Sequence, residues 1–181
     1  LYNKVVERLG SDAVVLGHEA KAYRVTEGGV EVDLLNKFSG ETISETGSIL
    51  IGADGIHSAI RAQMHPDQPP IHWGGCVMWR GVTRAKATRT GSSFLGLGTS
   101  TRRLVIYPIS QPDAQGLSLI NWIAEVTYDT DHDWQKTGYY TETPVADFLH
   151  NFQDMVYDWI DVPDMLANCD VAYENPMIDR D

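Results

Sequence analysis

The chain has 181 residues, of which 43% are hydrophobic, and it carries a formal net charge of −11 at pH 7. This length allows one domain, or parts of two, with a buried core. The negative charge argues against nucleic acid or an anionic membrane surface as a partner, and favours a small molecule. With two cysteines, no signal peptide and no long apolar run, the sequence indicates a cytoplasmic protein without a disulfide framework or a zinc site.

Residues 1–10 have the composition of the last turns of a helix, with apolar side chains on one face and Gly10 as the terminator. No residue of the capping type precedes them, so we expect the chain to begin inside an element. The apolar residues 13–16 that follow predict a short parallel strand.

A meander of three strands is predicted next. Residues 19–26, 30–35 and 41–46 have strand composition, and turn residues separate them at positions 28–29 and 39–40. Short turns of this kind join antiparallel neighbours. We therefore expect three antiparallel strands in sequence order.

The next segment combines a strand, a glycine-flanked aspartate and a helix. Residues 48–51 predict a buried strand that returns to the main sheet, and residues 57–64 predict a helix. Gly52 and Gly55 allow a close backbone approach around Asp54. The turn therefore offers free backbone N–H groups and a short carboxylate at the end of a strand, where α/β sheets bind nucleotides.

Two interpretations of this turn are open. The Asp54 carboxylate could accept hydrogen bonds from the two hydroxyls of a ribose, with Arg61 bracing the loop or meeting a phosphate. Alternatively, Asp54 is only the cap of a tight strand–helix turn. The residues of the turn alone do not separate the two.

A proline-rich segment at residues 66–70 divides the chain. The segments after it have strand composition with turn residues between them, which predicts an antiparallel sheet from residues 75–83, 92–97, 102–108 and 117–126. Helices are predicted at residues 145–152 and 155–159. The glycine-rich residues 96–100 are followed by a strand rather than a helix, so they predict a hairpin turn and not a phosphate loop.

No metal site is expected. Asp129, Asp131 and Asp133 resemble the start of a calcium loop, but Trp134 and Tyr140 stand where such a loop requires glycine and glutamate. These residues therefore predict a solvated acidic loop. The histidines are spaced too irregularly for a helical metal pair.

Aromatic side chains on the predicted sheet allow two interpretations. Trp79, Tyr107 and Trp122 could simply form the core of a half-buried sheet, which is the usual place of strand aromatics. They could instead line a pocket for a planar ligand, whose carboxylate a guanidinium such as Arg80 would bind. Because side chains alternate along a strand, only one of Trp79 and Arg80 can face such a pocket.

The segment from Gly52 to Arg61, GADGIHSAIR, resembles the second flavin motif of the class A FAD-dependent aromatic monooxygenases. That family includes salicylate, 6-hydroxynicotinate and p-hydroxybenzoate hydroxylases. Further matches lie at residues 78–83, 104–110, 118–122 and 176–181. Taken together, the series is most similar to the branch that hydroxylates 5-methylphenazine-1-carboxylate.

The resemblance implies a mixed α/β fold in two parts. Residues 1–66 would form the central part of a Rossmann-like FAD-binding domain with a meander. Residues 71–176 would form an antiparallel-sheet domain that binds the substrate, and residues 177–181 would return toward the FAD domain. The Gly-x-Gly-x-x-Gly motif that holds the FAD pyrophosphate does not occur in this sequence, nor does the family's third motif. We therefore expect the chain to be the central part of a larger enzyme.

The function implied is hydroxylation of a planar aromatic acid, phenazine- or salicylate-like, with FAD as cofactor, NADH or NADPH as reductant and dioxygen as oxidant. The cofactor-binding residues carried over are Gly52, Asp54, Gly55, Ser58 and Arg61. The substrate-pocket residues implied are Trp79, Arg80, Tyr107, Pro108 and Trp122. No catalytic residue is identified, and the oligomer could be a homodimer. The alternatives are a related FAD-dependent reductase or halogenase, or a stable fragment that binds no cofactor.

Overall fold

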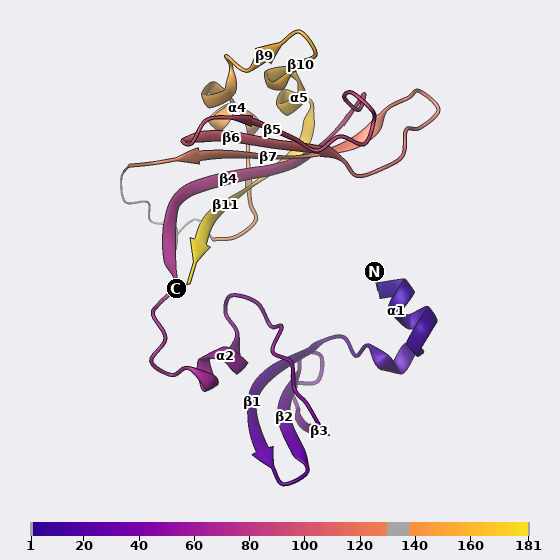
Figure 1. Cartoon of the computed structure of the whole chain (residues 1–181), viewed down its shortest axis with the longest axis vertical. Coiled ribbons are helices and arrows are strands. Elements are labelled where there is room, and N and C mark those ends of the chain that lie inside the picture. Colours follow the sequence, from indigo (N-terminus) through magenta and orange to yellow (C-terminus); the bar gives the residue numbers. More distant parts are fainter. Residues whose placement is uncertain (1, 130–137, 181) are drawn as a thin grey trace. The chain divides into compact units, whose positions relative to one another are not determined.

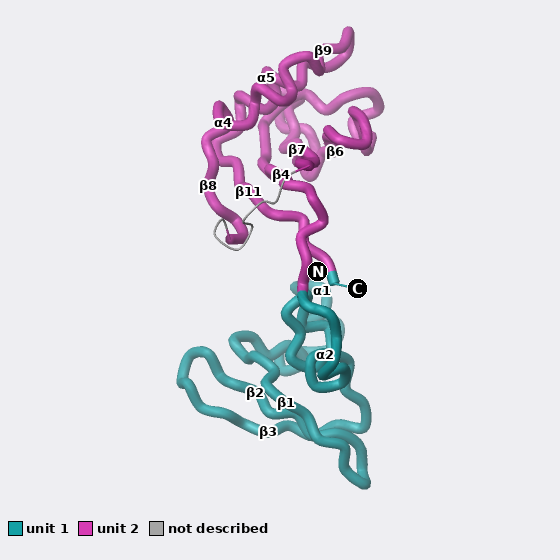
Figure 2. The backbone as a smooth tube through the Cα atoms, turned by 90° about the vertical axis from the view of Figure 1, so that its left-hand side faces the viewer, with its two compact units in different colours: residues 1–70, 180–181 teal, residues 71–179 magenta. Residues whose placement is uncertain are grey.

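The computed structural model describes residues 2–129 and 138–180. The chain forms two compact units, one of residues 1–70 with 180–181 and the other of residues 71–179 (Figure 2). The change from one unit to the other falls at the end of the proline-rich segment. The last strand stays with the second unit as far as Asp179, three residues beyond the expected end of that domain at residue 176.

The first unit contains the predicted meander. Strands β1 (His18–Thr26), β2 (Gly29–Asn36) and β3 (Thr42–Gly47) pair antiparallel in that order, which confirms the prediction (Figure 1). Before them lie helix α1 (Tyr2–Leu9) and a single 3-10 turn, η1 (Ser11–Ala13). Gly10 has φ 91°, a conformation that side chains resist, so it ends α1 as expected.

Two strand predictions in this unit are wrong. Residues 13–16 and 48–51 form no strand, and the described part of the unit contains no parallel sheet. Their apolar side chains are instead left at the surface, with Val15 68% and Ile51 82% exposed. The physical reason is that strand propensity alone does not make a strand, because the backbone also needs a neighbour to hydrogen-bond. Helix α2 (Ala59–Met64) forms, two residues later than predicted.

The second unit is built on a six-stranded antiparallel sheet with the order β5-β6-β7-β4-β11-β8. The central strands are long, and the edge strands are short. Their bounds are β4 His72–Ala85, β5 Leu95–Gly98, β6 Arg102–Pro108, β7 Ser118–Thr127, β8 Thr141–Thr143 and β11 Cys169–Asp179. The four predicted strands and the hairpin turn after β5 are confirmed, whereas β8 and β11 were not predicted.

The helices of this unit only partly follow the prediction. Helix α4 (Val145–Leu149) continues into a 3-10 turn, η2 (His150–Phe152), as expected for residues 145–152. The helix predicted at residues 155–159 is wrong, because this segment enters a hairpin of β9 (Val156–Tyr157) and β10 (Ile160–Asp161). Helix α5 (Val162–Ala167) follows, begun by an Asp161 cap and a proline in its first turn.

Helices α4 and α5 lie against one face of the sheet, and no described helix of this unit lies against the other (Figure 1). The core is therefore formed on the covered face, from sheet and helix side chains such as Leu104, Trp122, Phe148 and Leu166. We call the opposite surface of the sheet the open face. Residues 130–137, with the acidic positions Asp131 and Asp133, lie outside the described residues.

Candidate functional site

The glycine-flanked turn in the first unit is organised by Asp54. One carboxylate oxygen accepts the Ser58 hydroxyl, and the other accepts the backbone N–H groups of Ala59 at 2.8 Å and Ile60 at 3.3 Å. The Ser58 bond, with help from the backbone bonds, lowers the pKa of Asp54 below its ordinary value. The carboxylate thus caps α2, although its side chain is still exposed to solvent.

The two glycines of the turn have different physical roles. A Cβ on Gly52 would lie 2.9 Å from Cγ2 of Ile60, so only glycine lets this segment pass so close to α2. Gly55 has φ 82° and open space around it, which leaves its backbone accessible. The segment lines a groove of about 690 Å³ with apolar side chains from the meander, among them Val32 and Leu34.

The other two residues of the motif also act within the turn. The Ser58 hydroxyl accepts the backbone N–H of Arg61 at 2.9 Å and so supplies the N-cap of α2. The Arg61 guanidinium donates from Nε to Gln68 at 3.0 Å, and thereby ties the helix to the proline-rich segment. All five motif residues are therefore near one another, and their assignment to a cofactor is taken up as a proposal below.

Replacing Asp54 with alanine should destabilise α2. Loss of a capping carboxylate typically costs about 0.5–2 kcal/mol, so amide hydrogen exchange across Ala59–Met64 should accelerate several-fold at neutral pH. Because the folded-state pKa of Asp54 is depressed, its contribution is present above the ordinary carboxyl pKa and disappears as pH falls through the lower folded value. The difference between wild type and variant should therefore close in acid. Equal exchange in both proteins at neutral pH would contradict the capping role.

On the sheet, alternation separates the expected pocket residues between two faces. Trp79 and Trp122 are 4% and 0% exposed and belong to the core on the covered face. Trp79 stacks on Phe148 with ring centroids 4.7 Å apart and donates its Nε1 proton to Glu174. The structure therefore does not bring these two tryptophans together with Arg80, because the helices of the second unit cover their side of the sheet.

Trp122 also depends on a glycine of the neighbouring strand. A Cβ on Gly81 would overlap the Trp122 ring and the sulfur of Cys169, so a side chain there would displace the indole. The Trp122 Nε1 proton goes to the hydroxyl of Thr83 at 3.0 Å, which satisfies its only polar group in the core. This indole is fixed and shielded from any ligand on the open face.

Arg80 lies on the open face. It is half-buried in a hollow of about 580 Å³, where its neighbours include Asn121 of β7 and Tyr173 of β11. Within the described residues its guanidinium has no ion pair or side-chain hydrogen bond. The buried amide nitrogen of Asn121 likewise has no hydrogen-bond partner. Donors without acceptors are costly, so the hollow can bind an acceptor group, although the carboxylate of Asp170 also lines it.

Two other arginines of this sheet, Arg102 and Arg103, are already paired. Arg102 makes two bonds of 2.7 Å to the Asp154 carboxylate and one to the Asn151 carbonyl, which anchor η2 to the sheet. Arg103 on the open face forms an ion pair with Glu125 of the adjacent strand at 2.7 Å. Arg80 is therefore the guanidinium on this sheet that is available without breaking an ion pair seen among the described residues.

Tyr107 and Pro108 alternate between the two faces along β6, although both line the hollow on the covered side of the sheet that is described below. Tyr107 stacks on Phe94 with ring centroids 5.4 Å apart, and its cross-strand partner is Asn121 of the open face. Pro108 is paired with Ile120, a core residue of the covered face. Of the five expected pocket residues, Arg80 and Tyr107 thus have positions on the open face.

Two residues of the hollow were not expected from the sequence. Asn121 is a polar residue in a strand of apolar and aromatic neighbours, which could have marked it. Tyr140 has φ 57°, a strained conformation for a tyrosine, and its backbone N–H is held by the buried Asn175 side chain at 3.1 Å. Its ring meets Tyr173 edge-on at 6.4 Å. No local pattern predicts that these residues and Arg80 meet, because they come from separate parts of the chain.

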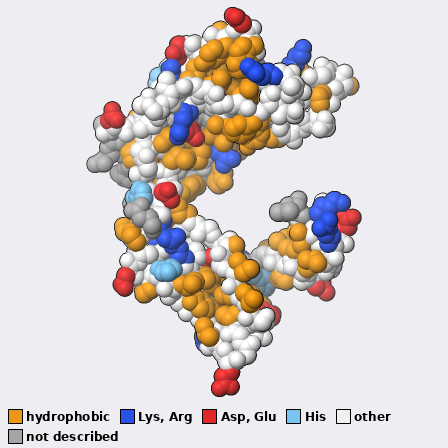
Figure 3. Space-filling view, viewed as in Figure 1, with side chains coloured by type: hydrophobic (Ala, Val, Ile, Leu, Met, Phe, Trp, Pro, Cys, Tyr) orange, Lys and Arg blue, Asp and Glu red, His pale blue; other side chains and the backbone are white. Residues whose placement is uncertain are grey.

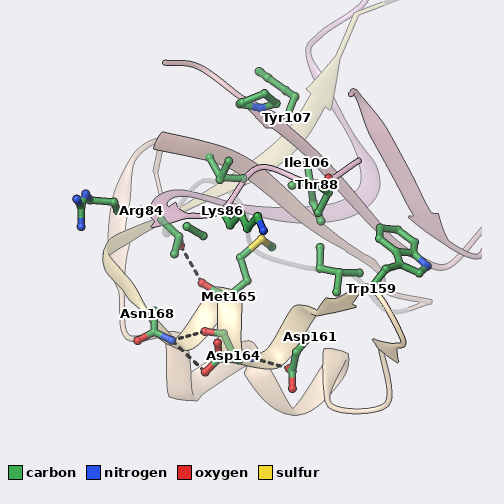
Figure 4. Close-up of a pocket in the computed structure, with 15 residues that line it drawn as sticks. Arg84, Lys86, Thr88, Ile106, Tyr107, Trp159, Asp161, Asp164, Met165 and Asn168 are labelled. Atoms are coloured by element: carbon green, nitrogen blue, oxygen red, sulfur yellow. Dashed lines mark hydrogen bonds between the residues drawn. The ribbon is translucent and has the colours of Figure 1, made fainter. Parts of the chain in front are cut away.

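A second hollow lies on the covered side of the sheet. It has a volume of about 370 Å³ and is enclosed by β4, β6, β7, the β9–β10 hairpin and α5 (Figure 4).

The molecular surface shows hydrophobic patches on the second unit with Lys and Arg side chains between them (Figure 3). Among the described residues, no cluster of His, Cys, Asp and Glu could hold a metal ion, and no helix could span a membrane.

Comparisons with known proteins agree with this architecture. The chain is 35% identical over 180 residues to the phenazine 1,6-dicarboxylic acid hydroxylase PhzS of Lysobacter antibioticus, a match that covers 98% of this chain and 44% of that protein. It is 36% identical over 76 residues to the aurachin C monooxygenase/isomerase of Stigmatella aurantiaca, covering 41% of this chain and 18% of the relative. The chain thus spans less than half the length of these relatives. No family model matches it.

Two solved structures share the fold. The 2,6-dihydroxypyridine-3-hydroxylase of Arthrobacter nicotinovorans matches with a TM-score of 0.66 at 15% identity, over 98% of this chain and 48% of the other. A protein described as an FAD-containing monooxygenase from Photorhabdus luminescens matches with a TM-score of 0.62 at 16% identity, over 98% and 50% of the two chains. The chain is thus similar in sequence to part of an aromatic hydroxylase, and it shares the fold of the corresponding parts of these two structures.

Proposed function

We propose that this chain supplies a cofactor-contacting turn and the substrate-binding sheet of an FAD-dependent enzyme that hydroxylates a planar aromatic acid, with NADH or NADPH as reductant. The observation that carries the proposal is the pair of unsatisfied donors on the open face, the Arg80 guanidinium and the Asn121 amide nitrogen. A carboxylate on the substrate would satisfy both, and a guanidinium can bind it through two parallel bonds.

The open face has room for more than one ring. Tyr107 pairs with Asn121, and Ile123 pairs with Arg80. Arg80 and Tyr107 are thus two strands apart and offset by two residues, which places their Cα atoms about 12 Å apart at ordinary strand spacings. A three-ring aromatic acid could bind Arg80 at one end and contact the Tyr107 ring at the other. Flat ligands gain most from such aromatic contacts.

The turn around Asp54 fits a flavin nucleotide. Its carboxylate is exposed, and three donors of its own turn leave part of its capacity of about four acceptor sites free. Gly52 and Gly55 permit close approach to the backbone, and the turn lines a groove of nucleotide-compatible size. Asp54 would bind ribose hydroxyls, while Ser58 and Arg61 hold the turn in place.

When bound and reduced, FAD would supply the electrons that activate dioxygen, one atom of which is transferred to the ring while the other leaves as water. The residues of this chain bind and orient. Arg80 and Asn121 would fix the carboxylate, so that one ring position is presented for attack. Tyr140 and Tyr173, which line the hollow with Arg80, would exclude water from the ring and so limit side reactions.

The relatives indicate the substrate class. One relative is named as a hydroxylase of phenazine 1,6-dicarboxylic acid, which is a planar three-ring acid. The dimensions of the open face and its single available guanidinium are compatible with a ligand of this type. We therefore propose a multi-ring aromatic carboxylic acid as the substrate of the complete enzyme.

The proposal can be tested on the purified 181-residue chain. We expect no flavin absorbance after purification, because the loop that anchors the FAD pyrophosphate in this family does not occur in the sequence. Stoichiometric flavin absorbance would show that the chain binds the cofactor without that loop. Separately, calorimetric titration should show that phenazine-1,6-dicarboxylate binds at least tenfold more tightly than unsubstituted phenazine. Equal binding of acid and neutral ring would contradict the role assigned to Arg80 and leave only the flavin fold.

A further inference from the structure

The hollow on the covered side of the sheet has the construction of a small-molecule site. Its floor is apolar and rigid, formed by Ile106 and Ile120 from the sheet and by Met165 from α5, and its volume of about 370 Å³ suits a ligand of one to three rings. Because side chains alternate between the two faces along a strand, Ile106 and Ile120 point away from the Arg80 hollow on the open face. The two hollows therefore lie on opposite faces of the sheet, and Arg84 contributes to the lining of both.

Trp159 forms one wall, and neighbouring residues hold it in place. Its ring is 44% exposed, which is unusual for so large an apolar surface, and it stacks on Tyr157 with centroids 5.8 Å apart. The Arg89 guanidinium lies 5.6 Å from the ring centroid. Arg89 reaches this position from a backbone with φ 51°, a conformation that side chains rarely adopt. An indole exposed and fixed in this way is ready to stack against a ligand.

Lys86 supplies an available charge. Its side chain extends into the hollow (Figure 4), and it has no partner among the described residues. The lining also carries two carboxylates, which keep their negative charge: Asp161 accepts the Asp164 backbone N–H at 2.9 Å, and Asp164 accepts the Asn168 amide at 3.1 Å. Figure 4 shows both at α5, away from the Lys86 side chain, so Lys86 is the charged side chain of the lining that has no partner among the described residues.

We propose that this hollow is a second binding site, which takes a small aromatic anion with its ring against Trp159 and its carboxylate at Lys86. The ring would lie over the Ile106 and Ile120 floor, and the anionic group would face the ammonium. The site lies on the opposite side of the sheet from the open face, so its occupancy does not depend on the proposed catalytic function.

The test uses the full chain labelled with 5-fluorotryptophan and titrated with 2-naphthoate, followed by fluorine NMR. Trp159 is assigned by the Trp159→Phe variant. We expect its resonance to shift saturably, and to do so equally in the Arg80→Met variant, in which the open-face site is disabled. Lys86→Met keeps the aliphatic stem and removes the charge, and should weaken binding about tenfold. Lys4→Met, which removes an exposed cation of α1, is the matched control and should change nothing.

Three results would overturn this proposal. Unchanged affinity in Lys86→Met would remove the charge recognition, and equal affinity for the neutral 2-naphthamide would do the same. A Trp159 shift that is lost in Arg80→Met would show that the ligand binds only to the open face. If Arg80→Met leaves phenazine-1,6-dicarboxylate binding intact while the Trp159 site behaves as described, the proposed function fails and this site stands.

Discussion

Replacing Trp122 with alanine should lower the free energy of unfolding of the second unit by about 3–5 kcal/mol. The indole is 0% exposed, lies over Gly81, packs near Phe148 with ring centroids 6.2 Å apart and donates to Thr83. Alanine would leave a large cavity and remove one of the two hydrogen bonds of the Thr83 hydroxyl, which would still donate to the Met165 carbonyl. Because domains typically have only about 5–15 kcal/mol of stability, the variant should be near the limit of folding.

Urea unfolding followed by tryptophan fluorescence measures this loss, since all five tryptophans lie in residues 71–179. Trp159→Ala is the matched control, because it deletes the same side chain at a 44% exposed position and should cost far less. A further variant, Trp122→Phe, distinguishes a role of Trp122 in the core from a role in ligand binding. If Trp122→Phe folded normally but lost binding of phenazine-1,6-dicarboxylate, the indole would belong to the substrate site after all.

Replacing Arg80 with methionine should weaken binding of an aromatic carboxylic acid by about 10- to 150-fold, which corresponds to the 1.5–3 kcal/mol of a hydrogen bond to a charged group. The expected cause is loss of a guanidinium that has no other partner among the described residues. Stability should change little or rise slightly, because a half-buried unpaired charge is removed. Calorimetry with phenazine-1,6-dicarboxylate measures the affinity, and urea unfolding measures the stability.

Arg80→Lys provides the conservative comparison. Lysine keeps the charge but not the planar fork, so it should restore part of the affinity. Asn121→Leu should add a smaller loss, since its amide is the second donor of the hollow. If the wild-type protein, Arg80→Met and Arg80→Lys bound the acid with equal affinity, the open face would not be the site that binds the carboxylate.

Several features of the fold follow from local sequence patterns. The meander is encoded by three runs of strand composition with turn residues between them, and β6 begins and ends at the predicted residues. The flavin-type motif around Asp54 likewise folds locally, because its carboxylate bonds to donors only four to six positions away in sequence. Interactions over such short separations need no distant partner, so a pattern of residues is enough to predict them.

Other elements depend on distant segments. Strand β11 pairs with β4, and residues 155–159 become part of a hairpin instead of the predicted helix, since that hairpin leads directly into α5. The strand-like residues 13–16 and 48–51 stay irregular for the opposite reason, because no described strand pairs with them. Strand formation is decided by a neighbour, and the neighbour is not written in the segment itself.

The candidate site shows the same division most clearly. The sequence by itself determined that Trp79 and Arg80 lie on opposite faces, because side chains alternate along a strand. It also determined the turn around Asp54. Only the tertiary structure decided which face is covered, since α4 and α5 come much later in the chain and pack on the tryptophan side. That packing places Trp79 and Trp122 in the core and leaves Arg80 beside Asn121 on the open face, where a ligand can reach it.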